Sequence, residues 1–247
     1  MQNNLTAAII IPARYGSTRF PGKVLKMLNG KTVLEWCYQA AVRSQAGPVL
    51  IATDDPRIQK AAAQFNAPSV LTSSLCPSGT DRVYEAAKSR PEDVIINLQG
   101  DELFVEPDTV QKILSALRRD PEAAIATAAA PLLDAGKINS PHTVKVVLSA
   151  QGRALYFSRS PIPHASKTTP GPVYLEHIGI YAFRKTSLEQ FVRLPVGRLE
   201  ALEGLEQLRA LENGLPIQVV TVGSAPVNIN VPEDLEHAAR RLKEQHA

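Results

Sequence analysis

Three cationic side chains lie within one short loop near the N-terminus, directly after an apolar strand. They are Arg14, Arg19 and Lys23, and the segment from Pro12 to Lys23 also contains two glycines, two prolines, a serine and a threonine. Such a loop can turn tightly, expose backbone N–H groups and bring the cations together. Cations beside exposed amides suit the oxygens of a triphosphate. The alternative is an ordinary solvated loop, and the segment matches neither a Walker A loop nor a dinucleotide-binding turn.

The turn Gln99-Gly100-Asp101-Glu102 follows another apolar strand and carries a second group able to do chemistry. The carboxyl ends of parallel strands share one edge of a sheet, so we expect Asp101 to face the same cleft as the cations. A carboxylate beside bound phosphates is unfavourable unless a cation lies between them, and Mg²⁺ prefers one or two carboxylates plus substrate phosphates. Asp101 is therefore a candidate Mg²⁺ ligand, the alternative being a plain turn residue.

Three further segments carry polar residues whose roles the pattern leaves open. The run from Ser78 to Arg82 could present hydroxyls and amides to a base or a sugar, or could simply cap a helix. His177 lies at the start of an apolar strand, where a histidine at the rim of the core is the alternative to a ligand contact. Glu206 and Arg209 lie one helical turn apart, which is more typical of a surface ion pair than of a site.

Composition narrows the class of protein. The 247 residues carry a formal net charge of +3 that is spread along the chain, whereas a nucleic-acid-binding protein concentrates Lys and Arg in a patch. Cys37 and Cys76 lack the spacing of a metal site or a disulfide framework, which indicates free thiols in a reducing compartment. The N-terminal apolar run is too short for a signal peptide or a membrane span. We therefore expect a cytoplasmic protein with no nucleic-acid or membrane partner.

The apolar pattern alternates between strands and helices along the chain. Predicted strands cover residues 6–12, 48–53, 94–98, 123–128, 143–149, 153–158, 174–183 and 216–222. Predicted helices cover residues 32–44, 55–65, 80–88, 108–118, 186–191 and 199–212, with a last helix from Pro232. Fully apolar strands that alternate with helices indicate a mostly parallel sheet covered on both faces. Because the Pro-, Ser- and Thr-rich loop 160–173 is too short for a domain linker, we expect one domain with an elaborated C-terminal half.

Taken in order, the motifs of this chain resemble those of 3-deoxy-manno-octulosonate cytidylyltransferases, also called CMP-KDO synthetases. The resemblance extends from about residue 7 to the C-terminal helix. The motifs are the segment 12–23, Ala52-Thr53-Asp54-Asp55, the segment 78–82, the turn 99–102, Val144-Lys145-Val146-Val147, Ala154-Leu155-Tyr156-Phe157-Ser158-Arg159, His177-Ile178-Gly179-Ile180-Tyr181 and Leu205-Glu206-Gln207-Leu208-Arg209. The N-terminal loop alone would indicate only a nucleotidyltransferase. Its combination with Tyr-Phe-Ser-Arg at 156–159 and Glu-Gln-Leu-Arg at 206–209 indicates the octulosonate branch.

The resemblance implies a fold, a reaction and an assembly. The fold would be a three-layer α/β/α, Rossmann-like nucleotidyltransferase with a mostly parallel central sheet, forming a single domain over residues 1–247. An added β-rich region at about residues 140–185 would serve dimerisation and sugar binding in a homodimer. The anomeric C2 hydroxyl of a 2-keto sugar acid, 3-deoxy-manno-octulosonate, would attack the α-phosphorus of CTP. The products would be pyrophosphate and a CMP-sugar for lipopolysaccharide or capsule biosynthesis.

The resemblance also implies the roles of individual residues. The CTP phosphates would be held by the basic loop, at Arg14, Ser17, Arg19 and Lys23. The cytidine pocket would be lined by Ser78, Thr80 and Gln99. The sugar acid would be surrounded by Arg159, His177, Glu206 and Gln207, with Arg159 on its carboxylate. Mg²⁺ would bind Asp101 and the residue at position 230, and the catalytic set would be Arg14, Lys23 and Asp101.

Two positions depart from the family pattern. Asn230 stands where the family usually has a second metal-binding Asp, and Leu103 stands where proline usually follows Gly-Asp-Glu. An amide oxygen can coordinate Mg²⁺ but adds no negative charge, so the ion should be held less firmly. Two alternatives follow: a cytidylyltransferase for another acid (an amino-octulosonate, a nonulosonate or an acid of specialised metabolism), or a catalytically weak nucleotide-binding homologue. Retention of the cations, Asp101 and Arg159 disfavours the second.

Overall fold

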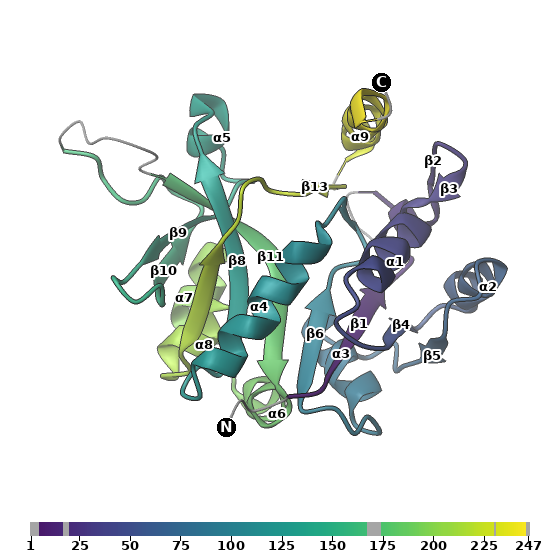
Figure 1. Ribbon diagram of the computed structural model, residues 1–247, viewed down its shortest axis with the longest axis horizontal. Coiled ribbons are helices and arrows are strands. Elements are labelled where there is room, and N and C mark those ends of the chain that lie inside the picture. The colour runs from purple at the N-terminus through teal and green to yellow at the C-terminus, as the bar shows by residue number, and fades with distance from the viewer. Residues whose placement is uncertain (1–4, 17–19, 167–173, 230, 246–247) are drawn as a thin grey trace. The chain divides into compact units, whose positions relative to one another are not determined.

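The computed structural model describes residues 5–16, 20–166, 174–229 and 231–245 (Figure 1). The chain forms two compact units. The first unit comprises Thr6–Gln111 and Pro226–Ala247, and the second comprises Lys112–Ala225 with Met1–Leu5. Helix α4 (Pro107–Arg119) contains the residues at which the chain passes from one unit to the other. The single domain expected over the whole chain stays a prediction.

The first unit is built on four parallel strands in the order β6-β1-β4-β5. Their bounds are β1 (Ala7–Ala13), β4 (Val49–Thr53), β5 (Ser69–Leu71) and β6 (Val94–Leu98). Ile9, Ile10 and Ile11 of β1 are all fully buried. Successive side chains of a strand point to opposite faces, so a continuous apolar run requires cover on both faces.

Three helices connect these strands: α1 (Val33–Arg43), α2 (Pro56–Gln64) and α3 (Gly79–Ala87). Through α1 and α2 the chain crosses the sheet in one direction, from β1 to β4 to β5, and through α3 it returns past β1 to β6. Because such crossovers are right-handed, the return places α3 on the face opposite α1 and α2. The winding therefore changes direction between β1 and β6, and open α/β sheets bind ligands at the carboxyl ends of strands at such a point.

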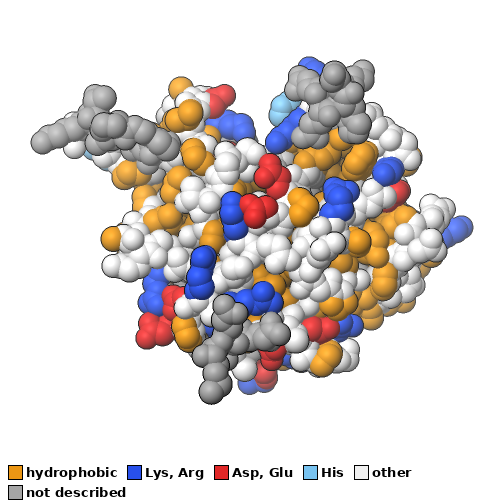
Figure 2. Space-filling model, viewed as in Figure 1, with side chains coloured by type: hydrophobic (Ala, Val, Ile, Leu, Met, Phe, Trp, Pro, Cys, Tyr) orange, Lys and Arg blue, Asp and Glu red, His pale blue; other side chains and the backbone are white. Residues whose placement is uncertain are grey.

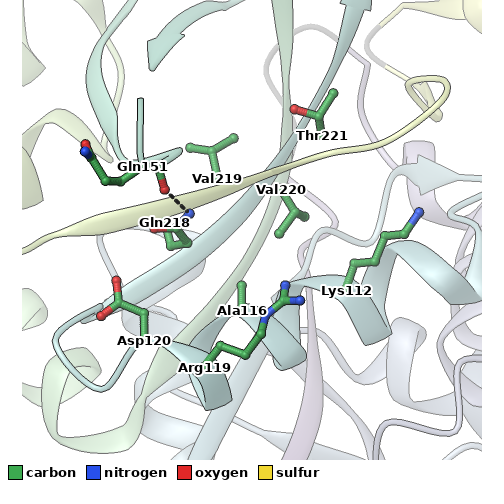
Figure 3. Close-up of a pocket in the computed structure, with 9 residues that line it drawn as sticks. All are labelled: Lys112, Ala116, Arg119, Asp120, Gln151, Gln218, Val219, Val220 and Thr221. Carbon is green, nitrogen blue, oxygen red and sulfur yellow. Dashed lines mark hydrogen bonds between the residues drawn. The ribbon is translucent and has the colours of Figure 1, made fainter. Parts of the chain in front are cut away.

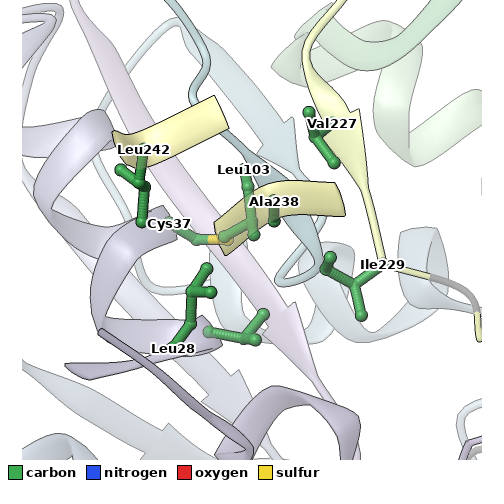
Figure 4. Close-up of a cluster of buried hydrophobic side chains, with 8 residues drawn as sticks. Leu28, Cys37, Leu103, Val227, Ile229, Ala238 and Leu242 are labelled. Atoms are coloured by element: carbon green, nitrogen blue, oxygen red, sulfur yellow. The ribbon is translucent and has the colours of Figure 1, made fainter. Parts of the chain in front are cut away.

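The C-terminal segment completes the first unit. β13 (Val227–Asn228) pairs antiparallel with β7 (Glu102–Leu103), and α9 (Pro232–Gln245) follows. β7 packs on α1, and α9 packs on β2 (Met27–Leu28), while η1 (Lys23–Leu25) and β3 (Lys31–Thr32) also contact α1. One buried cluster comprises Leu28, Val33, Cys37, Leu103, Val227, Ile229, Ala238 and Leu242. The side chains labelled in Figure 4 point toward one another. This cluster fixes the segment before α9 beside the turn that follows β6.

The second unit contains a mixed sheet around β8 (Ile125–Leu132). β8 pairs in parallel with β12 (Ile217–Thr221) and antiparallel with β11 (Tyr174–Arg184). β11 in turn pairs with the hairpin of β9 (Lys145–Leu148) and β10 (Ala154–Ser158) through β9. The unit's helices are α5 (Ala135–Asn139), α6 (Lys185–Arg193), α7 (Arg198–Glu203) and α8 (Leu208–Glu212).

Most predicted elements are confirmed, but the predicted helix over residues 199–212 is wrong. The structure has two short helices, α7 and α8, because Gly204 ends α7 in the left-handed conformation with a φ of 61°. The break leaves Leu205, Glu206 and Gln207 in a turn. The short elements β2, β3, β5, β7, β13, η1 and α5 were not predicted, since two to five residues carry too little periodicity to recognise.

The charge on the visible face of the molecule is mixed. Figure 2 shows Lys and Arg side chains lying among Asp, Glu and apolar side chains on that face. In the described part of the chain, no helix combines the length and the apolar character that crossing a bilayer requires.

Candidate functional site

Tyr15 anchors both ends of the basic loop that follows β1. The Gly22 N–H donates to the Tyr15 carbonyl oxygen at 2.9 Å, and Gly22 has a φ of 67°, a conformation that favours glycine. A Cβ on Gly22 would lie 3.1 Å from the Tyr15 ring. The Arg57 guanidinium stacks 3.4 Å from the centre of that ring. Arg57 is held by Asp55, and this hydrogen bonding lowers the pKa of the Asp55 carboxyl.

The structure describes two of the four predicted phosphate-binding residues. Ser17 and Arg19 lie outside the described residues, so their predicted roles stay predictions. Arg14 is exposed directly after β1, and Lys23 begins η1 at the other end of the loop. The two described cations thus stand at the ends of a loop whose closure Tyr15 enforces.

Lys23 and Asp101 form an ion pair in the first unit. The Lys23 ammonium also donates to the Ile229 carbonyl oxygen at 2.8 Å, and the Ile229 N–H donates to the Asp101 carbonyl oxygen at 3.0 Å. The side chains of Lys23 and Asp101 are 14% and 17% exposed, so neither is sealed from solvent. Lys23 follows β1 and Asp101 follows β6, which flank the change of winding. The expected meeting of the cationic loop with the carboxylate is confirmed for this pair.

Gly100 allows the turn of Asp101 to approach β1 closely. A Cβ on Gly100 would lie 3.1 Å from the Pro12 carbonyl oxygen, a contact tighter than side chains normally make. The other predicted metal ligand, Asn230, lies outside the described residues. Within the described ranges, no three His, Cys, Asp or Glu side chains come together as a metal cluster. A one-carboxylate site suits Mg²⁺ only where substrate phosphates supply further oxygens.

Thr80 and Gln99 of the predicted cytidine pocket are linked through Asn97, which sequence reasoning missed. Gln99 Nε2 donates to Asn97 Oδ1 at 2.9 Å, and Asn97 Nδ2 donates to Thr80 Oγ1 at 3.3 Å. Thr80 and Asn97 are buried, and Gln99 is partly exposed. The available signal was an amide within the otherwise apolar strand Val94-Ile95-Ile96-Asn97-Leu98, because a buried polar side chain needs partners.

The rest of the segment 78–82 is engaged in local structure. The Asp81 N–H donates to Ser78 Oγ at 3.2 Å, and the Ser78 hydroxyl donates to the Asp81 carboxylate at 2.7 Å, so Ser78 caps α3. Arg82 is buried, donates to the Thr72 hydroxyl and forms an ion pair with Asp54 at 2.9 Å. The pair joins two of the sequence motifs and fixes the start of α3 against the end of β4.

In the second unit, backbone oxygens orient Arg159 just after β10. Its Nε donates to the Glu203 carbonyl oxygen at 2.7 Å and its Nη1 to the Pro141 carbonyl oxygen at 2.7 Å. Its Nη2 donates to the Gly204 carbonyl oxygen at 3.2 Å. The Glu203 carboxylate accepts from the Arg159 N–H at 2.9 Å and from the Ser158 hydroxyl at 2.6 Å. Both the backbone and the guanidinium of Arg159 are therefore fixed.

His177 lies on β11 at the edge of an aromatic group. Its ring is 4.9 Å from that of Phe157 and 5.4 Å from that of Tyr181. Desolvation lowers the pKa of His177 to about 3, so the imidazole is neutral near pH 7. Nε2 lies 3.1 Å from the Thr127 hydroxyl oxygen, which is within hydrogen-bond reach of two β11 carbonyls. Because the Thr127 hydroxyl donates its one proton to a carbonyl, its oxygen accepts from the Nε2–H of His177. The Nδ1 of His177 is then unprotonated and can accept a hydrogen bond.

The turn between α7 and α8 carries Glu206 and Gln207. Gln207 is 6% exposed, and in the described part of the chain its buried Nε2 has no hydrogen-bond partner. Such a donor is costly to bury unless a ligand or water accepts from it. Arg209 does not lie on the surface, as an exposed ion pair with Glu206 would require. Arg209 is buried and binds both carboxylate oxygens of the buried Glu200, at 2.7 and 2.6 Å.

Comparisons with known proteins identify the family of this chain. A family model described as cytidylyltransferase matches residues 8–219. The 3-deoxy-manno-octulosonate cytidylyltransferase of Elusimicrobium minutum is 47% identical, over 95% of this chain and 97% of that protein. The Synechococcus elongatus protein of the same name is 45% identical, over 93% and 95% of the two chains. A solved CMP:2-keto-3-deoxy-manno-octonic acid synthetase complexed with CTP superposes with a TM-score of 0.91 at 38% identity, covering 97% of this chain and 99% of that one.

The chain belongs to the 3-deoxy-manno-octulosonate cytidylyltransferase family. This membership confirms the resemblance drawn from the motifs, the mixed α/β fold and the class of enzyme, a nucleotidyltransferase. The family members named above match almost the whole of this chain, so both units lie inside the shared region.

A groove on the second unit is lined by none of the predicted site residues. Its volume is about 510 Å³, and Figure 3 shows Lys112 and Arg119 on α4 with Val220 and Thr221 on β12. The remaining lining residues are Ala116, Asp120, Gln151, Gln218 and Val219. The predicted site residues that the structure describes therefore lie outside this groove.

Proposed function

We propose that the protein transfers CMP from CTP to the anomeric hydroxyl of 3-deoxy-manno-octulosonate and releases pyrophosphate. In this reaction the first unit would bind CTP and the second would bind the sugar acid. The observation that carries the proposal is the Lys23–Asp101 pair at the point where the sheet's winding changes. A cation from the loop after β1 and a carboxylate from the turn after β6 suit a triphosphate with its counter-ion.

The chain's part in the nucleotide half is to position and neutralise CTP. Arg14 and Lys23, with Arg19 and Ser17 from the same loop, would bind the phosphate oxygens. The Thr80–Asn97–Gln99 chain of hydrogen bonds would present the Gln99 amide to the cytosine edge, because Asn97 fixes its orientation. Phosphoryl transfer of this kind depends on positioning and charge stabilisation more than on a protein nucleophile.

Three polar groups of the second unit match the chemistry of a sugar acid. Arg159 uses three of its five N–H groups on the described carbonyls, which leaves one on Nη1 and one on Nη2 for a carboxylate. His177 Nδ1 would accept from a sugar hydroxyl, and Gln207 Nε2 would donate to one. Glu206, in the same turn as Gln207, would accept from another hydroxyl.

The donor chemistry around Asp101 fits Mg²⁺. A carboxylate oxygen is a hard ligand, and substrate phosphates would supply the rest of the shell, with Asn230 as the second protein ligand. When bound, the ion would neutralise phosphate charge and lower the pKa of the attacking hydroxyl. Lys23 would then be released from Asp101 to the phosphates.

We further propose a cytoplasmic homodimer whose interface lies in the region 140–185. The two thiols support the location, since Cys37 is buried in α1 and Cys76 lies before α3 without a disulfide. The exposed Leu155 on β10 supports an interface at the hairpin. Sedimentation at micromolar concentration should give the mass of a dimer, and a monomer would contradict the proposal.

Pyrophosphate release tests the proposed function. CTP with 3-deoxy-manno-octulosonate should react fastest in a panel containing ATP, GTP, 8-amino-octulosonate and a nonulosonate. Equal turnover with a purine nucleotide would contradict the cytidine pocket. Faster turnover with another acid would keep the CTP half and replace the acceptor, and no turnover with any acid would point to a nucleotide-binding homologue.

A further inference from the structure

Lys145 is a fully buried cation that the proposed function does not use. It lies at the start of β9, and its ammonium donates to the backbone oxygens of Ser140 at 3.0 Å and Thr143 at 2.6 Å, and to that of Arg159. Burial, and next the charge of Arg159, lower the pKa of Lys145. Burying a charge is unfavourable unless it is fully hydrogen-bonded, and three carbonyls match the three N–H groups of an ammonium.

Two of the partners of Lys145 belong to a turn that also binds the Arg159 side chain, and the third is the peptide of Arg159. Ser140 and Thr143 flank Pro141, whose carbonyl accepts from Arg159 Nη1. The third partner is the Arg159 peptide itself. Lys145 therefore ties the turn 140–143 to the peptide of Arg159, and the same turn accepts from the Arg159 guanidinium through Pro141.

We propose that Lys145 is a positioning residue for the sugar-acid carboxylate, acting through the orientation of Arg159. This inference rests on the proposed role of Arg159 and adds the device that sets its geometry. A salt bridge between substrate and Arg159 needs both remaining Nη donors to face the carboxylate, so a small rotation of the guanidinium loses the bidentate contact. An apolar side chain at position 145 would leave three buried carbonyls without donors and free the turn to move.

The experiment compares Lys145→Met, which keeps length and removes charge and donors, with Lys145→Arg. The matched control is Lys137→Met, which removes an exposed lysine that lies 3.6 Å from Glu176 in the same unit. We expect Lys145→Met to raise KM for the sugar acid at least about tenfold, because misplacing a binding group by about 1 Å can cost roughly a hundredfold. KM for CTP should stay within about twofold, and calorimetric binding of CTP alone should be unchanged. Lys145→Arg should recover part of the loss, and Lys137→Met should behave as the wild type.

A double-mutant cycle with Arg159→Ala decides whether Lys145 acts through Arg159. If it does, the double variant should be no worse toward the sugar acid than Arg159→Ala alone. Two losses that multiply would overturn the proposal while keeping the role of Arg159. Arg159→Ala without effect on sugar-acid KM would instead contradict the proposed function of that residue. Equal losses for CTP and sugar acid in Lys145→Met would show a general structural role and would also overturn the proposal.

Discussion

The two units hold their principal cations in different ways. In the first unit, Lys23 is paired with the carboxylate of Asp101, and both side chains keep access to solvent. In the second unit, Arg159 donates to three backbone carbonyls, and a fully buried lysine holds both the turn that supplies one of them and the Arg159 peptide. A partly exposed ion pair is weak and can exchange partners, whereas hydrogen bonds to backbone fix a direction.

The difference matches what each unit is proposed to bind. A triphosphate with its counter-ion brings several charges. Asp101 therefore neutralises Lys23 until the substrate binds, and Lys23 then becomes available to the phosphates. A single carboxylate offers only two oxygens in one plane, so the guanidinium must be oriented beforehand. Substitutions in the first unit should therefore change charge balance, and substitutions in the second should change geometry.

The largest effect is expected for Asp101→Ala. Removing the carboxylate takes away the proposed metal ligand and the partner of Lys23, so turnover should fall by about a thousandfold or more, about 4 kcal/mol of transition-state stabilisation. Steady-state pyrophosphate release measures it. The matched control is Glu106→Gln, an exposed carboxylate of the same unit, which should keep wild-type turnover. An active Asp101→Ala would mean that the ion is held elsewhere.

Lys23→Ala should have the next largest effect. Loss of a charged phosphate contact costs a few kcal/mol, which predicts a fall of about a hundredfold in kcat/KM for CTP with a folded protein. Arg19→Ala should act in the same direction. Lys26→Ala is the control, because Lys26 is an exposed lysine three residues further on. Unchanged kcat/KM in both the Lys23 and the Arg19 variants would make the loop purely structural.

Sequence reasoning reached the first unit's site more completely than the second's. The apolar strands and their polar ends sufficed to bring Lys23 and Asp101 to one edge, because strand order in such sheets follows from crossover rules. The supports were missed: Asn97, Lys145 and the Glu200–Arg209 pair each depend on contacts far apart in the chain. Two signals were visible without the structure, a polar side chain within apolar strands at Asn97 and Lys145, and the glycine at position 204 inside a predicted helix.

A pH dependence of stability should distinguish the second unit. The pKa of His177 is about 3 in the folded protein and about 6.5 when unfolded, so the unfolded state binds more protons below pH 6.5. Stability from this group is therefore full above pH 6.5 and is lost as the pH falls toward 3. From pH 7 to pH 5 the loss should be about 1–2 kcal/mol, allowing for the partly exposed ring. Denaturant unfolding of His177→Gln should show a flatter pH dependence, and the exposed His237→Gln should not. The same slope in both variants would remove His177 as its source.

The smallest effect is expected for Asn230→Asp, at a position outside the described residues. If Asp101 is the only charged protein ligand, a second carboxylate should strengthen the attraction for a hard dication even with the oxygen in the same place. The free Mg²⁺ needed for half-maximal turnover should fall severalfold, less than the factor of ten that about 1.4 kcal/mol would give. Asn66→Asp adds the same charge at an exposed position of the first unit and should leave that requirement unchanged. Titrating turnover against free Mg²⁺ at saturating CTP measures both. If Asn230→Asp leaves the Mg²⁺ requirement unaltered, charge at position 230 does not govern binding of the ion. The transfer of Lys23 from Asp101 to the phosphates would then set the Mg²⁺ dependence.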